Sequence, residues 1–163
     1  MPSFEVLNLA VNTATNEITF NNEKIQVKKY LPVETKAGIV NLAVRGSLLK
    51  GIVDEVLVDA YFHLFIVENY TDIIFDQSEL SDILVNYDKI ISSGLLDEIL
   101  NAVPQEEYNY LIDCLGNFKD QMIRFSQSPA AANENSEEYL KLLTQMSEKA
   151  QPASKSRNRK PVN

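Results

Sequence analysis

The segment Asp54–Tyr70 would be apolar around nearly its whole circumference if it were helical. Leu57, Ala60, Tyr61, Leu64 and Val67 fall on one side at spacings of three and four, and Phe62, Phe65 and Ile66 fall on the others. A surface helix keeps one polar face, whereas a helix that is apolar all round is enclosed by its neighbours. The segment therefore predicts a central helix with other elements packed around it.

This segment does not predict a membrane span. Its most apolar run, Ala60–Val67, contains His63 and is followed directly by Glu68. A span needs about 20 consecutive apolar residues, so the run indicates a buried helix of a soluble domain.

Four other segments show helical periodicity, beginning at Pro32, Ser78, Leu95 and Pro104. Proline suits a first helical turn, serine can cap one, and Gly51 and Gly94 mark expected stops. The expected apolar stripes are Val33, Ala37, Val40, Val44 and Leu48; Leu80, Ile83, Leu84, Tyr87, Ile90 and Ile91; and Tyr108, Leu111, Ile112, Leu115, Phe118, Met122 and Phe125.

Short β-branched runs precede these helices. Ile18–Phe20 and Ile25–Val27 flank four polar residues, a pattern typical of a hairpin whose second strand continues to Tyr30. Phe4, Val6 and Leu9 are the apolar residues of an additional expected strand. The predicted class is α+β and mainly α: a compact bundle of about five helices with a small N-terminal β-hairpin or meander.

The chain of 163 residues fits one core domain with a separate C-terminal part. Residues 1–126 hold the hairpin and the helical core. Residues 127–135 have the polar and Pro-containing composition of a linker, 136–149 predict a terminal helix, and 150–163 predict a disordered basic tail. A terminal helix of this length is marginal in water and needs a docking surface.

The C-terminal part carries the candidate partner-binding residues. The terminal helix has one apolar stripe, Tyr139, Leu142, Leu143 and Met146, and the tail has four cations, Lys155, Arg157, Arg159 and Lys160. The tail has a net charge of +4, whereas the rest of the chain has 11 basic and 23 acidic residues. Such a division of charge favours binding to partners, and the stripe can be covered either by the body or by another chain.

Candidate catalytic residues are few. His63 is the single histidine, and its neighbours Phe62, Leu64 and Phe65 favour a neutral core or boundary position over a catalytic one. Cys114 has no neighbouring cation in sequence and is interpreted as structural.

The acidic pairs are interpreted as helix-start residues rather than metal ligands, because three of the four stand where predicted helices begin and a helix dipole favours negative charge there. They are Asp54 and Glu55, Asp97 and Glu98, Glu106 and Glu107, and Glu137 and Glu138. The sequence also contains no glycine-rich phosphate loop, nucleophile elbow, calcium loop or paired-cysteine zinc motif. We therefore expect no catalytic, cofactor-binding or metal site and no cofactor.

Partners and location follow from composition. A pI near 4.7 disfavours nucleic acid as a partner except through the basic tail. With one cysteine and no charged-then-apolar leader, we expect no signal-directed secretion. We expect no membrane partner either. We expect protein partners or a homo-oligomer, in a reducing cytoplasm.

Three segments resemble a known group of proteins: Lys29–Lys36, Asp59–Asp72 and Val103–Tyr108. In that order they are similar to small, poorly characterised virion and assembly proteins of tailed bacteriophages that infect Gram-positive bacteria. The resemblance covers about residues 25–115 and carries over no catalytic residue. It implies a structural or assembly role at the tail or the head-to-tail junction, located in the host cytoplasm or the virion.

Three functional hypotheses follow. The leading one is a nonenzymatic phage structural or assembly protein, or assembly chaperone, that acts through protein contacts with other phage subunits. The alternative is a small acidic adaptor or inhibitor that binds a host protein, which requires one contiguous acidic surface. A third is a hydrolase that pairs His63 with a carboxylate in a cleft.

Overall fold

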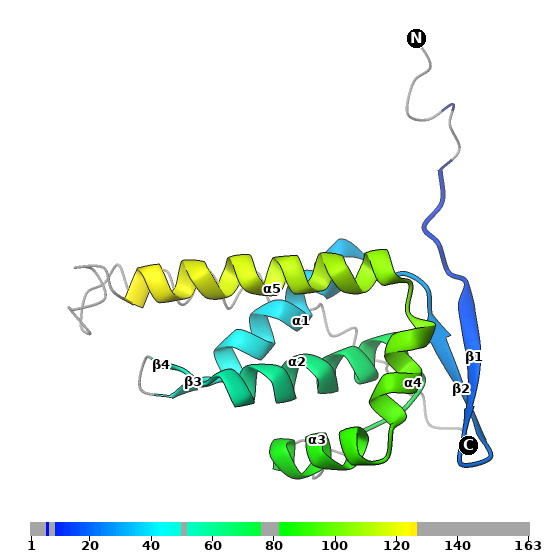
Figure 1. The fold of residues 1–163 in the computed structure, drawn as a ribbon. Coiled ribbons are helices and arrows are strands. Elements are labelled where there is room, and N and C mark those ends of the chain that lie inside the picture. Colours follow the sequence, from blue (N-terminus) through cyan, green and yellow to red (C-terminus); the bar gives the residue numbers. More distant parts are fainter. Residues whose placement is uncertain (1–5, 7–8, 50–51, 76–81, 127–163) are drawn as a thin grey trace, which may run out of the picture.

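The computed structural model describes residues 6, 9–49, 52–75 and 82–126, and over these it is mainly helical, with five helices and a small N-terminal hairpin (Figure 1). This confirms the predicted fold class. The elements are β1 (Thr15–Phe20), β2 (Glu23–Lys28), α1 (Val33–Gly46), β3 (Leu48–Leu49), β4 (Ile52–Val53), α2 (Glu55–Tyr70), α3 (Ile83–Ser92), α4 (Leu95–Ala102) and α5 (Gln105–Ser126).

Helix α2 is the centre of the bundle, as its apolar circumference predicts. It packs against α1, α3 and α4, and Figure 1 shows it between α1 and α3. Its buried residues are Val58, Ala60, Phe62, Leu64, Ile66, Val67 and Tyr70. Because α2 contacts elements on several sides, the remaining helices are positioned relative to it.

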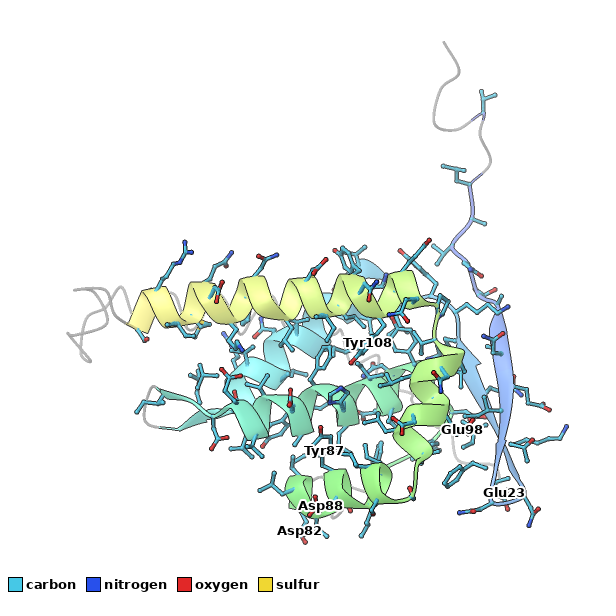
Figure 2. All side chains as sticks on the ribbon, viewed as in Figure 1. Glu23, Asp82, Tyr87, Asp88, Glu98 and Tyr108 are labelled. Carbon is cyan, nitrogen blue, oxygen red and sulfur yellow. The ribbon has the colours of Figure 1, made fainter. Side chains whose placement is uncertain are left out.

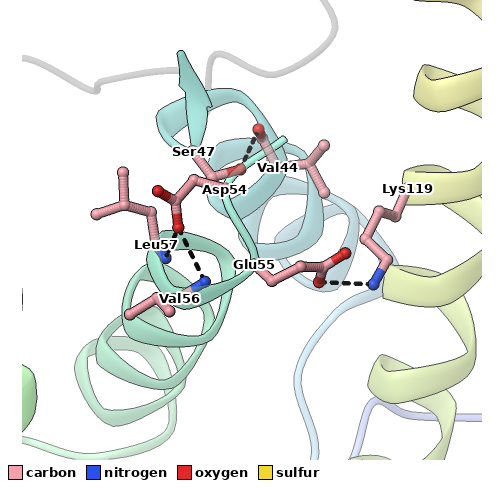
Figure 3. Close-up of polar contacts among 7 residues, drawn as sticks. All are labelled: Val44, Ser47, Asp54, Glu55, Val56, Leu57 and Lys119. Carbon is pink, nitrogen blue, oxygen red and sulfur yellow. Dashed lines mark hydrogen bonds and ion pairs between the residues drawn. The ribbon is translucent and has the colours of Figure 1, made fainter. Parts of the chain in front are cut away.

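The connection between α1 and α2 is a short β-hairpin that was not predicted from the sequence. Helix α1 ends at Gly46 rather than near Gly51, and β3 then pairs with β4. Asp54 caps α2, since its carboxylate accepts hydrogen bonds from the backbone N–H groups of Val56 and Leu57 at 3.0 and 3.1 Å (Figure 3). A Cβ atom at Gly46 would lie 2.8 Å from the Tyr61 ring, so the two helices approach closely here.

The N-terminal hairpin has a tighter turn than expected. Only Asn21 and Asn22 separate the strands, with φ of 50° and 67°, and Phe20 pairs with Glu23. Two consecutive residues with positive φ match the right-handed twist of the strands, and asparagine tolerates that conformation. The predicted four-residue connection was therefore wrong, as was the extension of the second strand to Tyr30, because β2 ends at Lys28.

The hairpin lies on the helices. Ile25 and Val27 are buried, Val27 bridges to Thr71 after α2, and the Asn16 side-chain amide donates to the Ala102 carbonyl of α4 at 2.7 Å. The additional N-terminal strand is not present in the described residues: Val6 and Leu9 lie outside any strand, and Phe4 is outside the described part.

Several predicted stripes are rotated relative to the buried faces. Val33, Leu84, Ile91 and Ile112 were expected to be covered but are exposed. The buried face of α1 is instead Lys36, Ile39, Val40, Ala43 and Val44. The difference arises because periodicity finds an apolar face and cannot anticipate a buried lysine.

The C-terminal predictions lie outside the described residues. These are the linker 127–135, the helix 136–149 and the tail 150–163, together with Ser78 and Leu80 of the third predicted helix. Across the described ranges, none of the helices has the length and apolar character needed to cross a membrane.

Candidate protein-binding groove

An apolar groove runs between α1 and α5. It has a volume of about 300 Å³, and its apolar lining is Val33, Ala37 and Val40 from α1 with Tyr110, Cys114 and Phe118 from α5. The side chains of Val33 and Tyr110 are 58% and 45% exposed. Single exposed apolar residues are ordinary on a protein surface, but apolar residues gathered in a concave site are typical of a binding surface.

One polar atom in the groove lacks a partner. The Oδ1 atom of Asn41, which lines the groove, is buried and finds no hydrogen-bond donor among the described residues. A buried acceptor without a donor costs about 1–3 kcal/mol.

A buried ion pair joins the two helices beside the groove. The Lys36 ammonium of α1 lies 2.7 Å from a carboxylate oxygen of Glu107 of α5, and the two side chains are only 4% and 15% exposed. The Tyr70 hydroxyl donates to the same carboxylate at 3.1 Å. Burial, followed by the charge and hydrogen bond of Glu107, raises the pKa of Tyr70 well above its ordinary value.

Aromatic rings complete the surroundings of the ammonium. The Lys36 Nζ atom is 4.2 Å from the centroid of the Tyr30 ring and 5.1 Å from that of Tyr110, distances at which the ring faces attract a cation. Tyr110 therefore contacts the ion pair and also lines the groove. This arrangement fixes one wall of the groove relative to α1.

Cys114 lies next to Tyr110 in the groove. A hydrogen bond with the Cys114 thiol raises the pKa of the Tyr110 hydroxyl. The thiol side chain is neither fully buried nor fully exposed. Sequence reasoning treated Cys114 only as a structural residue and missed its position in the groove.

His63 occupies a boundary position on α2, among tyrosines of α3 and α5. Its Nδ1 atom is 2.9 Å from the Asp59 carbonyl and 3.3 Å from the Tyr87 hydroxyl, and its Nε2 atom is 3.3 Å from the Tyr108 hydroxyl. Figure 2 shows Tyr87 on α3 and Tyr108 on α5. In the described part of the chain, no carboxylate hydrogen-bonds the ring, although the hydrolase hypothesis needs one.

The surroundings of His63 predict a pH dependence of stability. Burial lowers the pKa of His63 below its ordinary value of 6.5, so the unfolded chain binds the proton more readily. The contribution of neutral His63 to the free energy of unfolding is fully present above pH 6.5. It is lost as the pH falls from 6.5 through the pKa of His63 in the folded chain. We expect a lower urea midpoint at pH 5.5 than at pH 7.5.

The His63→Gln variant is the control for this prediction. Its difference in midpoint between the two pH values should be smaller than that of the natural chain, since glutamine does not titrate. Equal differences in the two proteins would assign the pH effect to other groups.

The acidic pairs have mixed roles. Asp54 caps α2, Glu55 pairs with Lys119 of α5 at 2.8 Å (Figure 3), and Asp97, Glu98 and Glu106 lie in first turns of helices. Glu107 also lies in a first turn, but it is the partner of a buried lysine, which a helix-start interpretation did not anticipate. Within the described ranges no three potential metal ligands cluster, and Glu137 and Glu138 fall outside those ranges.

The predicted partner-binding residues cannot be placed in this site. Tyr139, Leu142, Leu143, Met146, Lys155, Arg157, Arg159 and Lys160 all lie outside the described residues. Two groove residues that were missed, Tyr110 and Cys114, do carry a sequence signal. They lie eight and four residues before Phe118 and so extend the predicted stripe of that helix sideways from Leu111 and Leu115.

Comparison with known proteins gives no relative from which a function could be transferred. No family model, curated protein or solved structure matches this chain.

Proposed function

We propose that this chain is a nonenzymatic bacteriophage structural or assembly protein, at the tail or head-to-tail junction or as an assembly chaperone, and that the groove between α1 and α5 binds a helix of a protein partner. The observation that carries the proposal is the groove itself, with its six apolar lining residues. The proposal requires no catalytic role for any residue of the groove.

The dimensions of the groove favour a helix as the bound element. Along α5 the lining runs from Tyr110 to Gln121, which is about 16 Å at about 1.5 Å per residue. An amphipathic helix that lays its apolar face into such a groove is a common mode of protein recognition.

The phage assignment rests on the sequence resemblance, and the fold adds a reason for the three segments to occur together. Tyr30 and Lys36 come from the first segment, Tyr70 from the second and Glu107 from the third. These four residues form the buried ion-pair cluster. The resemblance is therefore consistent with a shared fold, since it follows the residues that hold the helices together.

The acidic adaptor is the less favoured candidate. Its charge mimicry needs one contiguous acidic surface, whereas exposed acids occur on the hairpin and on all five described helices. Figure 2 shows examples at Glu23 in the hairpin, Glu98 in α4, and Asp82 and Asp88 at α3.

A matched pair of valines tests the proposed function. Val33 is 58% exposed at the start of α1 and lines the groove, and Val56 is 63% exposed in the first turn of α2 and does not. An aspartate is compatible with either position, because the helix dipole favours negative charge there. We expect Val33→Asp to weaken partner binding about tenfold or more, equivalent to about 1.4 kcal/mol.

The measurement is the number of infectious particles formed when each variant replaces the natural protein during infection, with the chain itself sought in purified particles and in lysate. Val33→Asp should reduce particle formation while Val56→Asp supports it normally. Full particle formation with Val33→Asp would show that the groove has no role in assembly, and full formation without the protein would contradict the assembly role altogether.

A further inference from the structure

We infer that the helix bound in the groove between α1 and α5 is basic, with lysines or arginines along one flank of its apolar face. This inference rests on the proposed function, since it specifies the chemistry of the partner that the groove takes. Three features of α1 and α5 lead to it: a row of acids beside the groove, cations that are placed elsewhere, and the apolar lining of the groove itself.

An acidic row runs along α5, formed by Glu106, Asp113 and Asp120. The three side chains are exposed and follow one another at intervals of seven residues. Seven residues make almost two whole turns of an α-helix, so each acid is rotated by only about 20° from the one before it and lies about 10 Å further along the axis. The acidic row is therefore nearly parallel to the helix axis and extends over most of the groove.

The acidic row borders the groove on the side away from the core. Tyr110 lines the groove and lies four residues after Glu106. Asn117 also lines it and lies four residues after Asp113. Residues at this spacing are neighbours on a helix surface, so the row lies next to the lining. The buried residues of α5 lie further round the helix in the same direction, and they are Leu111 and Leu115. The row is thus the outer rim of the groove.

The wall formed by α1 adds an acid at one end of the groove. Lys36 and Glu107 lie in the first turns of α1 and α5 and form an ion pair, so both helices begin at the same end. Glu34 is exposed in the first turn of α1 and shares that end with Glu106. Acids therefore occur on both walls where the two helices begin.

The cations of α1 and α5 are placed away from the acidic row. Lys36 is paired with Glu107, and Lys119 is paired with Glu55. The other two cations lie in the last turns of their helices, past the groove-lining residues, and they are Arg45 and Arg124. Over the ranges that the structure describes, none of the ion pairs includes a residue of the row. The row therefore retains its charge for a partner.

These features together select a basic amphipathic helix. Its apolar face would enter the groove, and cations on its flank would face the acidic row, which favours this partner over neutral or acidic ones. A second copy of the chain would bring acids against acids, because exposed acids occur on all five described helices. Nucleic acid would likewise place phosphates against carboxylates. The groove thus fits a helix of a different, basic protein.

Three designed peptides are the probes for this inference. Each is about 18 residues long, which is about 27 Å as a helix, and has leucines at spacings of three and four on an alanine background. Along one flank, at intervals of seven residues, the peptides carry lysine, glutamine or glutamate. All three residues favour helix, so the peptides differ chiefly in charge.

Fluorescence anisotropy with the full chain measures the Kd of each labelled peptide at low and high salt. At low salt we expect the lysine peptide to bind about fivefold or more tightly than the glutamine peptide, and the glutamate peptide to bind most weakly. The differences should shrink at high salt, because exposed charges are screened. Equal affinities of the lysine and glutamine peptides, or no binding of any peptide, would overturn the inference.

Two matched double variants locate the charge that matters. Glu106→Gln with Asp113→Asn removes two charges from the acidic row. Asp88→Asn with Glu98→Gln removes two exposed charges from α3 and α4, which do not line the groove (Figure 2). The first pair should weaken binding of the lysine peptide about threefold or more and leave the glutamine peptide unchanged, and the second pair should affect neither. Equal weakening by both pairs would overturn the inference, since net charge alone would then attract the peptide.

An uncharged substitution shows whether the peptide occupies the groove. Ala37 is exposed and lines the groove, so Ala37→Trp fills it without changing the charge. It should abolish binding of the lysine and glutamine peptides alike, with circular dichroism showing that the helices remain folded. Binding that survives Ala37→Trp would overturn the inference. A dimer in light scattering that Ala37→Trp dissociates would also overturn it, because a second copy would then occupy the groove.

The peptide experiments are independent of the test of the proposed function. The particle assay with Val33→Asp uses no peptide and does not depend on the charge of the partner. Normal particle formation with Val33→Asp would contradict the role of the groove in assembly whatever the peptides do. Loss of this inference and loss of the proposed function are therefore distinguishable.

Discussion

Glu107→Ala should lower the free energy of unfolding by about 3–5 kcal/mol, because it leaves the Lys36 ammonium buried without a counter-charge. The Tyr70 hydroxyl would lose its acceptor at the same time. The measurement is urea unfolding followed by circular dichroism, and the neighbouring exposed residue provides the control. Glu106→Ala removes an acid from the same helical turn and should change stability by less than about 0.5 kcal/mol.

A double replacement separates the loss of the pair from the loss of packing. Lys36→Met with Glu107→Ala removes both charges and should recover at least half of the stability lost by Glu107→Ala alone, since a buried pair replaced by apolar groups is often neutral. A double variant as unstable as the single one would show that the hydrogen bonds and packing of Glu107, rather than the stranded ammonium, carry the effect.

Phe62→Ala should cost about 3–5 kcal/mol, because the ring is fully buried in the central helix and its removal leaves a cavity. Phe65, three residues along the same helix, is only partly buried and stacks on Tyr61 with centroids 5.9 Å apart. Phe65→Ala removes the same atoms and should cost less than half as much. Calorimetric unfolding of both variants measures the difference, and equal costs would mean that α2 is not enclosed as described.

The central helix could be predicted because its evidence is local. An apolar circumference over Asp54–Tyr70 predicts a helix enclosed by its neighbours, and α2 confirms it. The same pattern does not distinguish Phe62 from Phe65. Their different burial depends on where α1, α3 and α4 pack, and the sequence of α2 alone does not determine that packing.

The buried ion pair beside the groove could not be predicted, because its two residues are distant in the chain. Lys36 interrupts an apolar pattern, so the sequence predicts that it faces solvent unless its partner is known. Glu107 is predicted to be an ordinary acidic residue at a helix start. The two residues are 71 positions apart. The rotation of the α1 stripe has the same cause, since the face that holds Lys36 is the one that turns inward and Val33 turns out.

The separation of Lys36 and Glu107 has a consequence for synthesis of the chain. Helices α1 and α2 are joined by the short β3–β4 hairpin, so they can pair as soon as both have left the ribosome, whereas α5 must wait for residues 105–126. Until then the side of α1 that α5 will cover faces water. Lys36, in the first turn of α1, keeps that surface charged, and so resistant to aggregation, until the carboxylate that neutralises it has been made.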